Sequence, residues 1–356
     1  MWCTCVPRPD NYRWDVPNED PQSRLAAAPR WMLIVGTALV VALAGALGLV
    51  RATKAQMDGV ARVPGVVPAL SPATPGVENY LLVGSDTRET ADPADPDFEN
   101  IGSADLNPGK RSDTLMVLRY GTADGSVSLM SVPRDLYVRI GTGEKYDRIN
   151  AAYRLGPDTV VRTVVRALNI PIHHYLEVDF QGFKAIVDAI HGVEVCVDRA
   201  SRDKSTGFYI GRKACKVVDG TQALAYARSR HFEQKFKEGG WKMDASADIG
   251  RTERQRRFVN SLLKSTARYV AEHPFDAANV MREATAAFSV DPRLELVDLA
   301  RKLRPVADGG TLSYALPVAN DMVGNRSVVR LVNDAAPLLA YFAGTGPAPA
   351  VPGPQG

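Results

Sequence analysis

The sequence predicts an α/β protein with a central mixed β-sheet flanked by helices and preceded by one transmembrane helix. Three observations predict this class. Apolar runs typical of strands alternate with helical patterns between about residues 77 and 343. A run without charged residues covers residues 31–50. The hydrophobic fraction of 45% is that of a chain that buries a core rather than of a disordered chain.

The apolar run Trp31–Val50 predicts a helix that crosses a membrane. At a rise of 1.5 Å per residue it reaches roughly 30 Å, the thickness of a bilayer core. It is apolar on every face and is flanked by Arg30 and Arg51, which favours lipid over a soluble core. A buried helix and a cleaved signal peptide are the alternatives, since Ala42-Leu43-Ala44 fits a small-residue cleavage pattern. We predict an uncleaved, single-pass anchor in the cell membrane.

Regions rich in proline or glycine mark the limits of the predicted folded domain. Residues 1–30 are polar and proline-rich, which predicts a disordered cytoplasmic tail. Prolines punctuate residues 51–76, which predicts a linker, and residues 344–356 predict a disordered tail. The folded domain is therefore expected at residues 77–343, on the extracytoplasmic side. A net charge of only +3, with no zinc-finger or RNA-binding pattern, predicts no nucleic-acid partner.

The first part of this domain is predicted to be rich in strands. Tyr80–Val83 has the apolar composition of a buried strand. Thr114–Tyr120 and Ser126–Ser131 flank the turn residues Asp124-Gly125, which predicts a β-hairpin. Tyr137–Ile140 is a further strand candidate.

Helical patterns follow in the second part. Asp179 can cap a helix over residues 180–190, where apolar residues recur at helical spacing. A strand is expected at Val193–Val197, and a long helix from Asp248 to about residue 270. Helices that alternate with strands in this way favour a sheet covered by helices.

Two cysteines of the domain allow two interpretations. Cys196 and Cys215 can pair as a disulfide if the domain lies outside the membrane, where the environment is oxidising. Two buried thiols are the alternative.

Carboxylates lie at the ends of the predicted strands. Asp86 follows the first strand, and Asp113 precedes the second. Mg²⁺ takes carboxylate oxygens as ligands, so both are metal-ligand candidates, with Mn²⁺ as an alternative ion. A turn or a helix cap is the alternative role for each. If these strands are neighbours, the two carboxylates meet Arg134, which follows the third strand, at one edge of the sheet.

Arginines occur in the same motifs. A guanidinium binds phosphate oxygens through paired hydrogen bonds, so these side chains are phosphate-binding candidates. A surface salt bridge is the alternative role for each. The candidates are Arg111, Arg134, Arg228, Arg230 and Arg251. Arg254 and Gln255, near the start of the long helix, are further candidates, with a solvated helix face as the alternative.

Seven segments, in this order, resemble the LytR-CpsA-Psr family of bacterial envelope proteins over about residues 78–270. They are Asn79–Asp86, Arg111–Thr114, Ser131–Asp135, Arg148–Tyr153, Val178–Phe183, Ala223–Arg230 and Asp248–Gln255. The N-terminal apolar run agrees with the same resemblance.

The resemblance implies an activity and partners. Family members are known as membrane-anchored phosphotransferases that move a glycopolymer from a polyprenyl-pyrophosphate carrier onto peptidoglycan through a phosphodiester. It therefore implies a polyprenyl-pyrophosphate-linked glycan as donor, peptidoglycan as acceptor, and membrane attachment through residues 31–50. Two other hypotheses stay open. One is a hydrolase that releases the glycan phosphate to water, and the other is a non-catalytic module that binds polyprenyl phosphate.

The resemblance also implies roles for the candidate residues. Asp86 and Asp113 would hold Mg²⁺ against the pyrophosphate. The catalytic residues would be Arg111, Arg134, Asp135 and Arg251, with Asp135 as a candidate general base. The pyrophosphate would be bound by Arg88, Arg148, Arg228, Arg230, Arg254 and Gln255.

Some features depart from the family pattern. Arg148 stands where the family often has lysine, which keeps the charge and changes its geometry. Residues 231–247 are predicted to form an extra loop between two site motifs, and its Lys235, Lys237, Lys242 and Trp241 would shape access for the acceptor. Residues 271–343 match the family less clearly and receive no role.

Overall fold

The computed structural model describes residues 60–85 and 112–350, apart from residues 239, 245, 246, 274–279, 281, 284 and 285. These residues belong to the larger of two compact units, Thr53–Gly356. The predicted span at residues 31–50 and the predicted tail at residues 1–30 lie outside the described residues. In the part of the chain that is described, no helix is long and apolar enough to cross a membrane.

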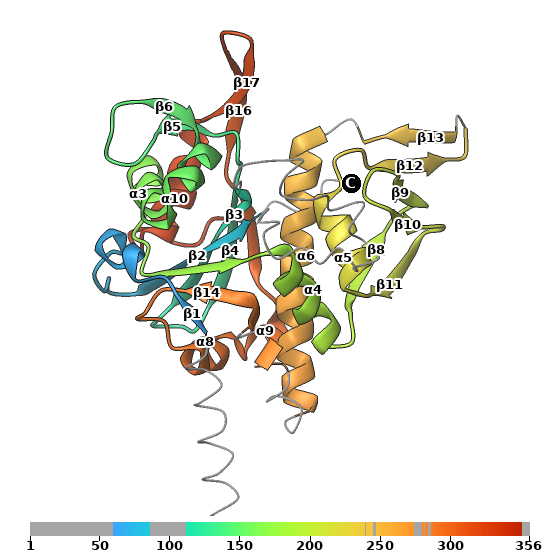
Figure 1. The fold of residues 1–356 in the computed structure, drawn as a ribbon, viewed down its shortest axis with the longest axis horizontal. Coiled ribbons are helices and arrows are strands. Elements are labelled where there is room, and N and C mark those ends of the chain that lie inside the picture. Colours follow the sequence, from blue (N-terminus) through green and yellow to red (C-terminus); the bar gives the residue numbers. More distant parts are fainter. Residues whose placement is uncertain are drawn as a thin grey trace, which may run out of the picture. The chain divides into compact units, whose positions relative to one another are not determined.

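A seven-stranded mixed sheet forms the centre of this unit (Figure 1), with the strand order β1-β14-β7-β2-β3-β4-β15. The strands are β1 Ala61–Arg62, β2 Val77–Ser85, β3 Ser112–Gly121, β4 Val127–Val132, β7 His174–Val178, β14 Phe288–Val290 and β15 Leu312–Ala315. Strand β2 is antiparallel to β3 and parallel to β7, and β4 is parallel to β15. The predicted central mixed sheet is confirmed.

Helices cover both faces of the sheet because strand side chains alternate between them. In β3, Leu115 and Val117 belong to one buried cluster, and Met116 and Leu118 belong to another. The first cluster includes residues of η2 Pro64–Ala69, η3 Ile149–Leu155, α3 Pro157–Leu168 and α10 Ala336–Phe342. The second packs against α6 Ala247–Glu272, α8 Leu296–Leu303 and α9 Val306–Gly309.

A second group of elements packs around a third buried cluster. Its members are α4 Phe180–Ala189, β8 Val193–Val197, β9 Ser201–Asp203, β10 Phe208–Ile210, β11 Ala214–Val218, α5 Gly220–Arg228, β12 Glu233–Phe236 and β13 Gly240–Met243. Figure 1 shows α6 between these strands and the central sheet. Phe258 of α6 is buried in this third cluster, whereas Val259 and Leu263 pack on the sheet cluster. Helix α6 therefore joins the two groups.

Two hairpins and one short helix complete the described fold. They are β5 Tyr137–Arg139 with β6 Tyr146–Arg148, β16 Val318–Val323 with β17 Arg326–Leu331, and η4 Asn333–Ala335.

Most of the predicted elements are confirmed. Strands β3 and β4 form the predicted hairpin, and Gly125 in its turn has φ +68°, which glycine adopts without a steric penalty. Asp179 caps α4, since its Oδ1 accepts a hydrogen bond from the Gly182 N–H at 2.8 Å. Helix α6 covers the predicted residues and extends to Glu272.

The linker predicted for residues 51–76 is wrong from residue 60 onward. Strand β1 extends the sheet there, and η2 follows it directly. Pro64 occupies the first turn of η2 and Val66 is fully buried. Proline fixes φ near −65°, which suits a short 3-10 helix as well as a linker, so the prolines alone did not separate the two.

The extra loop predicted at residues 231–247 is also wrong in form. Residues 233–236 and 240–243 are the antiparallel strands β12 and β13 of a four-stranded sheet with the order β10-β9-β12-β13. Residues 271–343, which received no role, supply β14 and β15 to the central sheet. The predicted disordered tail begins against the fold, because the Tyr314 hydroxyl donates to the Pro349 carbonyl at 3.1 Å.

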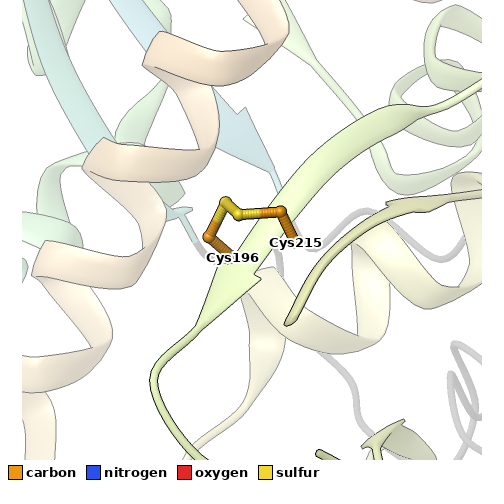
Figure 2. Close-up of a disulfide and its surroundings, with 2 residues drawn as sticks. All are labelled: Cys196 and Cys215. Atoms are coloured by element: carbon orange, nitrogen blue, oxygen red, sulfur yellow. A yellow bond between two sulfur atoms is a disulfide. The ribbon is translucent and has the colours of Figure 1, made fainter. Parts of the chain in front are cut away.

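Cys196 and Cys215 form a disulfide (Figure 2). They lie directly opposite each other on the antiparallel strands β8 and β11, with a Cα–Cα distance of 3.9 Å. Of the two interpretations that the sequence left open, the structure supports the disulfide.

Candidate active site

The ends of four neighbouring strands meet at one edge of the central sheet. Ser85 at the end of β2 pairs with Ser112 at the start of β3, and Leu115 of β3 pairs with Val132 at the end of β4. Gly84 pairs with Val178, the last residue of β7. The motifs that begin or end at these strands therefore lie together in the backbone, as the sequence predicts for neighbouring strands.

The two metal-ligand candidates belong to segments that meet this edge in the sequence: Asp86 is the residue after β2, and Asp113 is the second residue of β3. Gly84 pairs with Thr114 and Ser85 pairs with Ser112, so the register shifts at Asp113 and forms a β-bulge. Bulges recur beside functional sites, where they change the direction of the chain. Asp86, Arg88 and Arg111 lie outside the described residues, as do the side chains of Asp113 and Arg251. For these candidates the structure therefore fixes at most the backbone position.

Helix α5 brings Arg228 to the same edge. The helix ends at Arg228, and the guanidinium carbon lies 4.7 Å from the centre of the Phe180 ring. Phe180 is the first residue of α4, which starts two residues after β7 ends. Stacking of a guanidinium on an aromatic face orients its plane and leaves its edge able to donate hydrogen bonds. Phe180 was not a candidate from the sequence, where it counted only as a core position of a helix.

Gln255 fastens α6 to the end of α5. Its Nε2 donates to the Ala227 carbonyl at 3.0 Å, and its side chain is largely buried. The structure therefore places the end of α5, with Arg228 and Arg230, next to Gln255 of α6. Arg230 itself is exposed, two residues beyond the end of α5.

A buried carboxylate fixes the backbone between the two arginines. Ser229 is fully buried, and its hydroxyl donates to Asp203 Oδ2 at 2.6 Å. The His231 N–H donates to the same oxygen at 2.8 Å. Burial raises the pKa of Asp203, but the hydrogen bonds from Ser205, Ser229 and His231 outweigh it and hold that pKa below its usual value. Asp203 thus remains charged and holds the Arg228-Ser229-Arg230 segment.

Arg254 is buried and makes several contacts within the protein. Its Nη1 pairs with Asp244 Oδ2 at 2.7 Å, and its Nη2 donates to the Ser229 carbonyl at 3.2 Å. The guanidinium carbon lies 4.3 Å from the centre of the Phe232 ring. Burial lowers the pKa of Arg254, and the Asp244 carboxylate partly restores it. These contacts join α6 to both ends of the β12–β13 hairpin, and contact of Arg254 with a pyrophosphate stays a prediction.

A second group of candidates surrounds Asp135. Its Oδ2 lies 3.5 Å from the Arg134 Nε, and its Oδ1 lies 3.2 Å from the Arg148 Nε. The Arg148 Nη2 also donates to the Ser327 carbonyl of β17 at 2.5 Å. The segment after β4 is thus held between β6 and β17, and Arg134, Asp135 and Arg148 form one charged cluster.

Glu177 is a charged residue at this edge that the sequence interpretation missed. It belongs to β7 and pairs with Val83, near the end of β2. Its carboxylate accepts hydrogen bonds from the Tyr153 and Tyr175 hydroxyls. Tyr153 ends one of the seven motif segments, and a glutamate directly before the Val178–Phe183 motif was the available signal.

The comparisons with known proteins identify the family. The sequence model of the LytR_cpsA_psr family matches residues 51–338, which is most of the chain. The protein belongs to the LytR_cpsA_psr family. All the described candidates, from Arg134 to Gln255, lie inside the matched residues.

Individual members of the LytR_cpsA_psr family agree with this assignment. A probable cell wall biosynthesis protein LcpB of Corynebacterium glutamicum is 34% identical over 256 residues, which are 71% of this chain and 57% of that protein. A polyisoprenyl-teichoic acid–peptidoglycan teichoic acid transferase TagU of Bacillus anthracis is 38% identical over 160 residues, 45% of this chain and 48% of that protein. The chain thus spans about half the length of these curated relatives.

A solved structure of the LytR_cpsA_psr family shares the fold. The LytR-Csp2A-Psr enzyme from Actinomyces oris superposes with a TM-score of 0.62 at 23% sequence identity. The superposition covers 80% of this chain and 96% of the chain of that enzyme. At this identity the likeness shows the fold, including the central mixed sheet flanked by helices.

Proposed function

We propose that this protein is a membrane-anchored phosphotransferase that moves a glycopolymer from a polyprenyl-pyrophosphate carrier onto peptidoglycan. In this proposal residues 31–50 anchor the chain in the cell membrane and the catalytic domain lies on the extracytoplasmic side. Family membership supports it, as do the relatives LcpB, a probable cell wall biosynthesis protein, and TagU, a teichoic acid transferase. The Cys196–Cys215 disulfide supports an oxidising compartment.

The observation that carries the proposal is the position of Arg228. Its guanidinium stacks on Phe180 at the sheet edge where β2, β3, β4 and β7 begin or end. Phosphoryl transfer needs positioning and charge neutralisation more than covalent chemistry by the protein. A stacked arginine beside the ends of several motif-bearing strands supplies both for a pyrophosphate.

The reaction follows from the chemistry of the donor. A hydroxyl oxygen of peptidoglycan attacks the phosphorus atom next to the glycan, and the bond from that phosphorus to the bridging oxygen breaks. The glycan phosphate becomes a phosphodiester, polyprenyl phosphate leaves, and the hydroxyl proton passes to a base. Asp135 is the proposed base, and its two arginine neighbours Arg134 and Arg148 would compensate charge on the transferred phosphate.

The remaining candidates complete the proposed site. Arg111 and Arg251 would act with Arg134 on the reacting phosphate, and Arg88, Arg230 and Gln255 would bind the rest of the pyrophosphate. The bulge between β2 and β3 supports Asp86 and Asp113 as a carboxylate pair suited to Mg²⁺, with Mn²⁺ as the alternative ion. A bound Mg²⁺ would neutralise charge on the pyrophosphate oxygens.

Transfer assays with the full-length protein test the proposal. The purified chain, a polyprenyl-pyrophosphate-linked glycan and soluble peptidoglycan fragments are expected to give glycan-bearing fragments. Arg228→Ala should lower the transfer rate roughly 100-fold, the usual effect of removing one charge-stabilising donor. Arg257→Ala is the matched control, because Arg257 is an exposed arginine of α6 that pairs with Glu253.

Omission of the acceptor separates the other two functions. A hydrolase releases glycan phosphate equally well without peptidoglycan fragments, and a binding module turns over no donor in either case. Either result would exclude the transferase proposal.

A further inference from the structure

The four-stranded sheet β10-β9-β12-β13 has one face in the core and one face outward. Phe208 and Ile210 of β10 and Ser201 of β9 are buried on the inner face. Side chains alternate along strands, so Tyr209 and Arg202 lie on the other face. The pairing of Arg202 with Glu233 extends that outward face to β12.

The outward face carries an aromatic and cationic row across the strands. Tyr209 lies directly opposite Arg202 and is 59% exposed. The Arg202 guanidinium carbon lies 4.1 Å from the centre of the Trp241 ring, and its Nε pairs with Glu233 Oε2 at 2.6 Å. Arg202 is thus held between a carboxylate and an indole ring, and the row spans three strand spacings, ~14 Å. Flat aromatic rings with polar atoms at one end suit the apolar C–H faces and hydroxyl edges of sugars.

A hollow continues the row beyond Tyr209. It has a volume of about 550 Å³ and is lined by Tyr209, Gly211, Arg212, Cys215, Lys216 and neighbouring residues. The Tyr209 ring lies over Gly211, where an added Cβ would come within 2.8 Å of the Tyr209 hydroxyl. Glycine at position 211 therefore leaves room for the end of the Tyr209 side chain.

Cations outnumber carboxylates on this surface and around the hollow: Glu233 is paired with Arg202, and Glu194 lies beside the disulfide. Arg212, Lys216 and Lys235 are exposed, and none of them forms an ion pair with another residue that the structure describes. The partner that complements them is anionic, and Tyr209 and Trp241 add a preference for ring-shaped groups. Peptidoglycan has both properties, because its glycan strand offers sugar rings and its stem peptides carry carboxylates.

The outward sheet is connected to the candidate active site through the chain and through Arg254. Strand β12 starts three residues after Arg230. Arg254 joins α6 to Asp244 after β13 and to the Ser229 carbonyl between the site arginines. The sheet and the proposed pyrophosphate site are therefore neighbours in the fold.

We infer that the outward face of the β10-β9-β12-β13 sheet and the hollow beside Tyr209, together called here the outer sheet face, dock the peptidoglycan acceptor through the sugar rings of its glycan strand and the carboxylates of its stem peptides. The inference rests on the proposed function for the identity of the acceptor. Arg202, Tyr209 and Trp241 form the stacking row, and Arg212, Lys216 and Lys235 bind the carboxylates.

Cosedimentation of the detergent-solubilised full-length chain with insoluble peptidoglycan tests the inference without any donor. Trp241→Ala should weaken binding about tenfold, as truncation of a central aromatic anchor does. Lys235→Glu should weaken it severalfold and more strongly at low salt, because salt screens exposed charges. Lys264→Glu, an exposed lysine of α6 away from the outer sheet face, should bind like the wild type. Thermal unfolding verifies that each variant is folded.

Several outcomes would overturn the inference. Unchanged binding by both Trp241→Ala and Lys235→Glu removes the outer sheet face as the docking surface. The inference also fails if the two variants bind peptidoglycan like the wild type and lose binding only to vesicles of anionic phospholipid or to single-stranded DNA. Failure of the proposed function is recognised separately, because a wild-type chain that binds peptidoglycan but transfers no glycan keeps the surface and loses the activity.

Discussion

The ion pair between Asp244 and Arg254 should stabilise the fold far more than an ordinary surface pair. The Arg254 side chain is 9% exposed and the Asp244 side chain 27% exposed, and their atoms approach to 2.7 Å. Unit charges about 4 Å apart interact with about 4 kcal/mol at an effective dielectric constant of 20. Because Asp244 is partly solvated, about half of this should be lost in Asp244→Asn, roughly 2 kcal/mol. That value lies between exposed pairs, at about 0–1 kcal/mol, and broken buried pairs, at about 3–5 kcal/mol.

Urea or thermal unfolding measures this change. A loss of roughly 2 kcal/mol corresponds to a decrease in Tm of roughly 3 °C for a unit of this size. Glu253→Gln is the matched control, since it removes an exposed helix pair with Arg257 and should cost at most about 0.5 kcal/mol. A double-mutant cycle with Arg254→Met isolates the pair energy. Equal unfolding free energies for Asp244→Asn and Glu253→Gln, or a coupling energy near zero, would refute the reasoning.

Three further changes test other parts of the fold. Replacing Cys196 and Cys215 by serine removes a cross-link between residues 19 positions apart and should lower the unfolding free energy by about 3 kcal/mol. The reference is the oxidised wild type, and equal unfolding free energies would contradict the cross-link. Burial lowers the pKa of His174, but hydrogen bonds to the carboxylates of Asp291 and Glu78 outweigh it and raise the pKa from 6.5 to about 9. The charged imidazole thus stabilises the fold fully below about pH 6.5, and this stabilisation is lost as the pH rises through about 9. Urea unfolding over this pH range measures the decline, and an unchanged decline in His174→Gln would contradict the assignment. Val66→Ala should cost about 2 kcal/mol because Val66 is fully buried, whereas no cost would agree with the linker first predicted there.

Elements with a strong local signal were predictable from the sequence. The Asp124-Gly125 turn, the cap at Asp179 and the length of α6 depend on nearby residues, so the pattern and the structure agree. From the sequence, the motifs at the ends of β2, β3 and β4 could be expected to lie together only if these strands are neighbours. The pairing of Ser85 with Ser112 and of Leu115 with Val132 supplies that condition.

Features that depend on distant contacts were not predictable. Whether Pro64 begins a linker or a 3-10 helix depends on the burial of Val66 against strands far along the chain. The roles of Phe180 under Arg228 and of Asp244 beside Arg254 also depend on tertiary packing. Periodicity assigned Phe180 to a core helix, and no local pattern distinguishes a core ring from one that supports a guanidinium.

The most direct measurement is phosphorus NMR of the products that the full-length protein makes from a polyprenyl-pyrophosphate-linked glycan and peptidoglycan fragments. The account predicts a phosphodiester signal attached to the fragments, with an equal amount of polyprenyl phosphate. The initial rate at which both signals grow should fall roughly 100-fold with Arg228→Ala and stay unchanged with Arg257→Ala. Glycan monophosphate in place of the phosphodiester, or product formation by Arg228→Ala at the wild-type rate, would contradict a transferase site built around Arg228 at the edge of the central sheet.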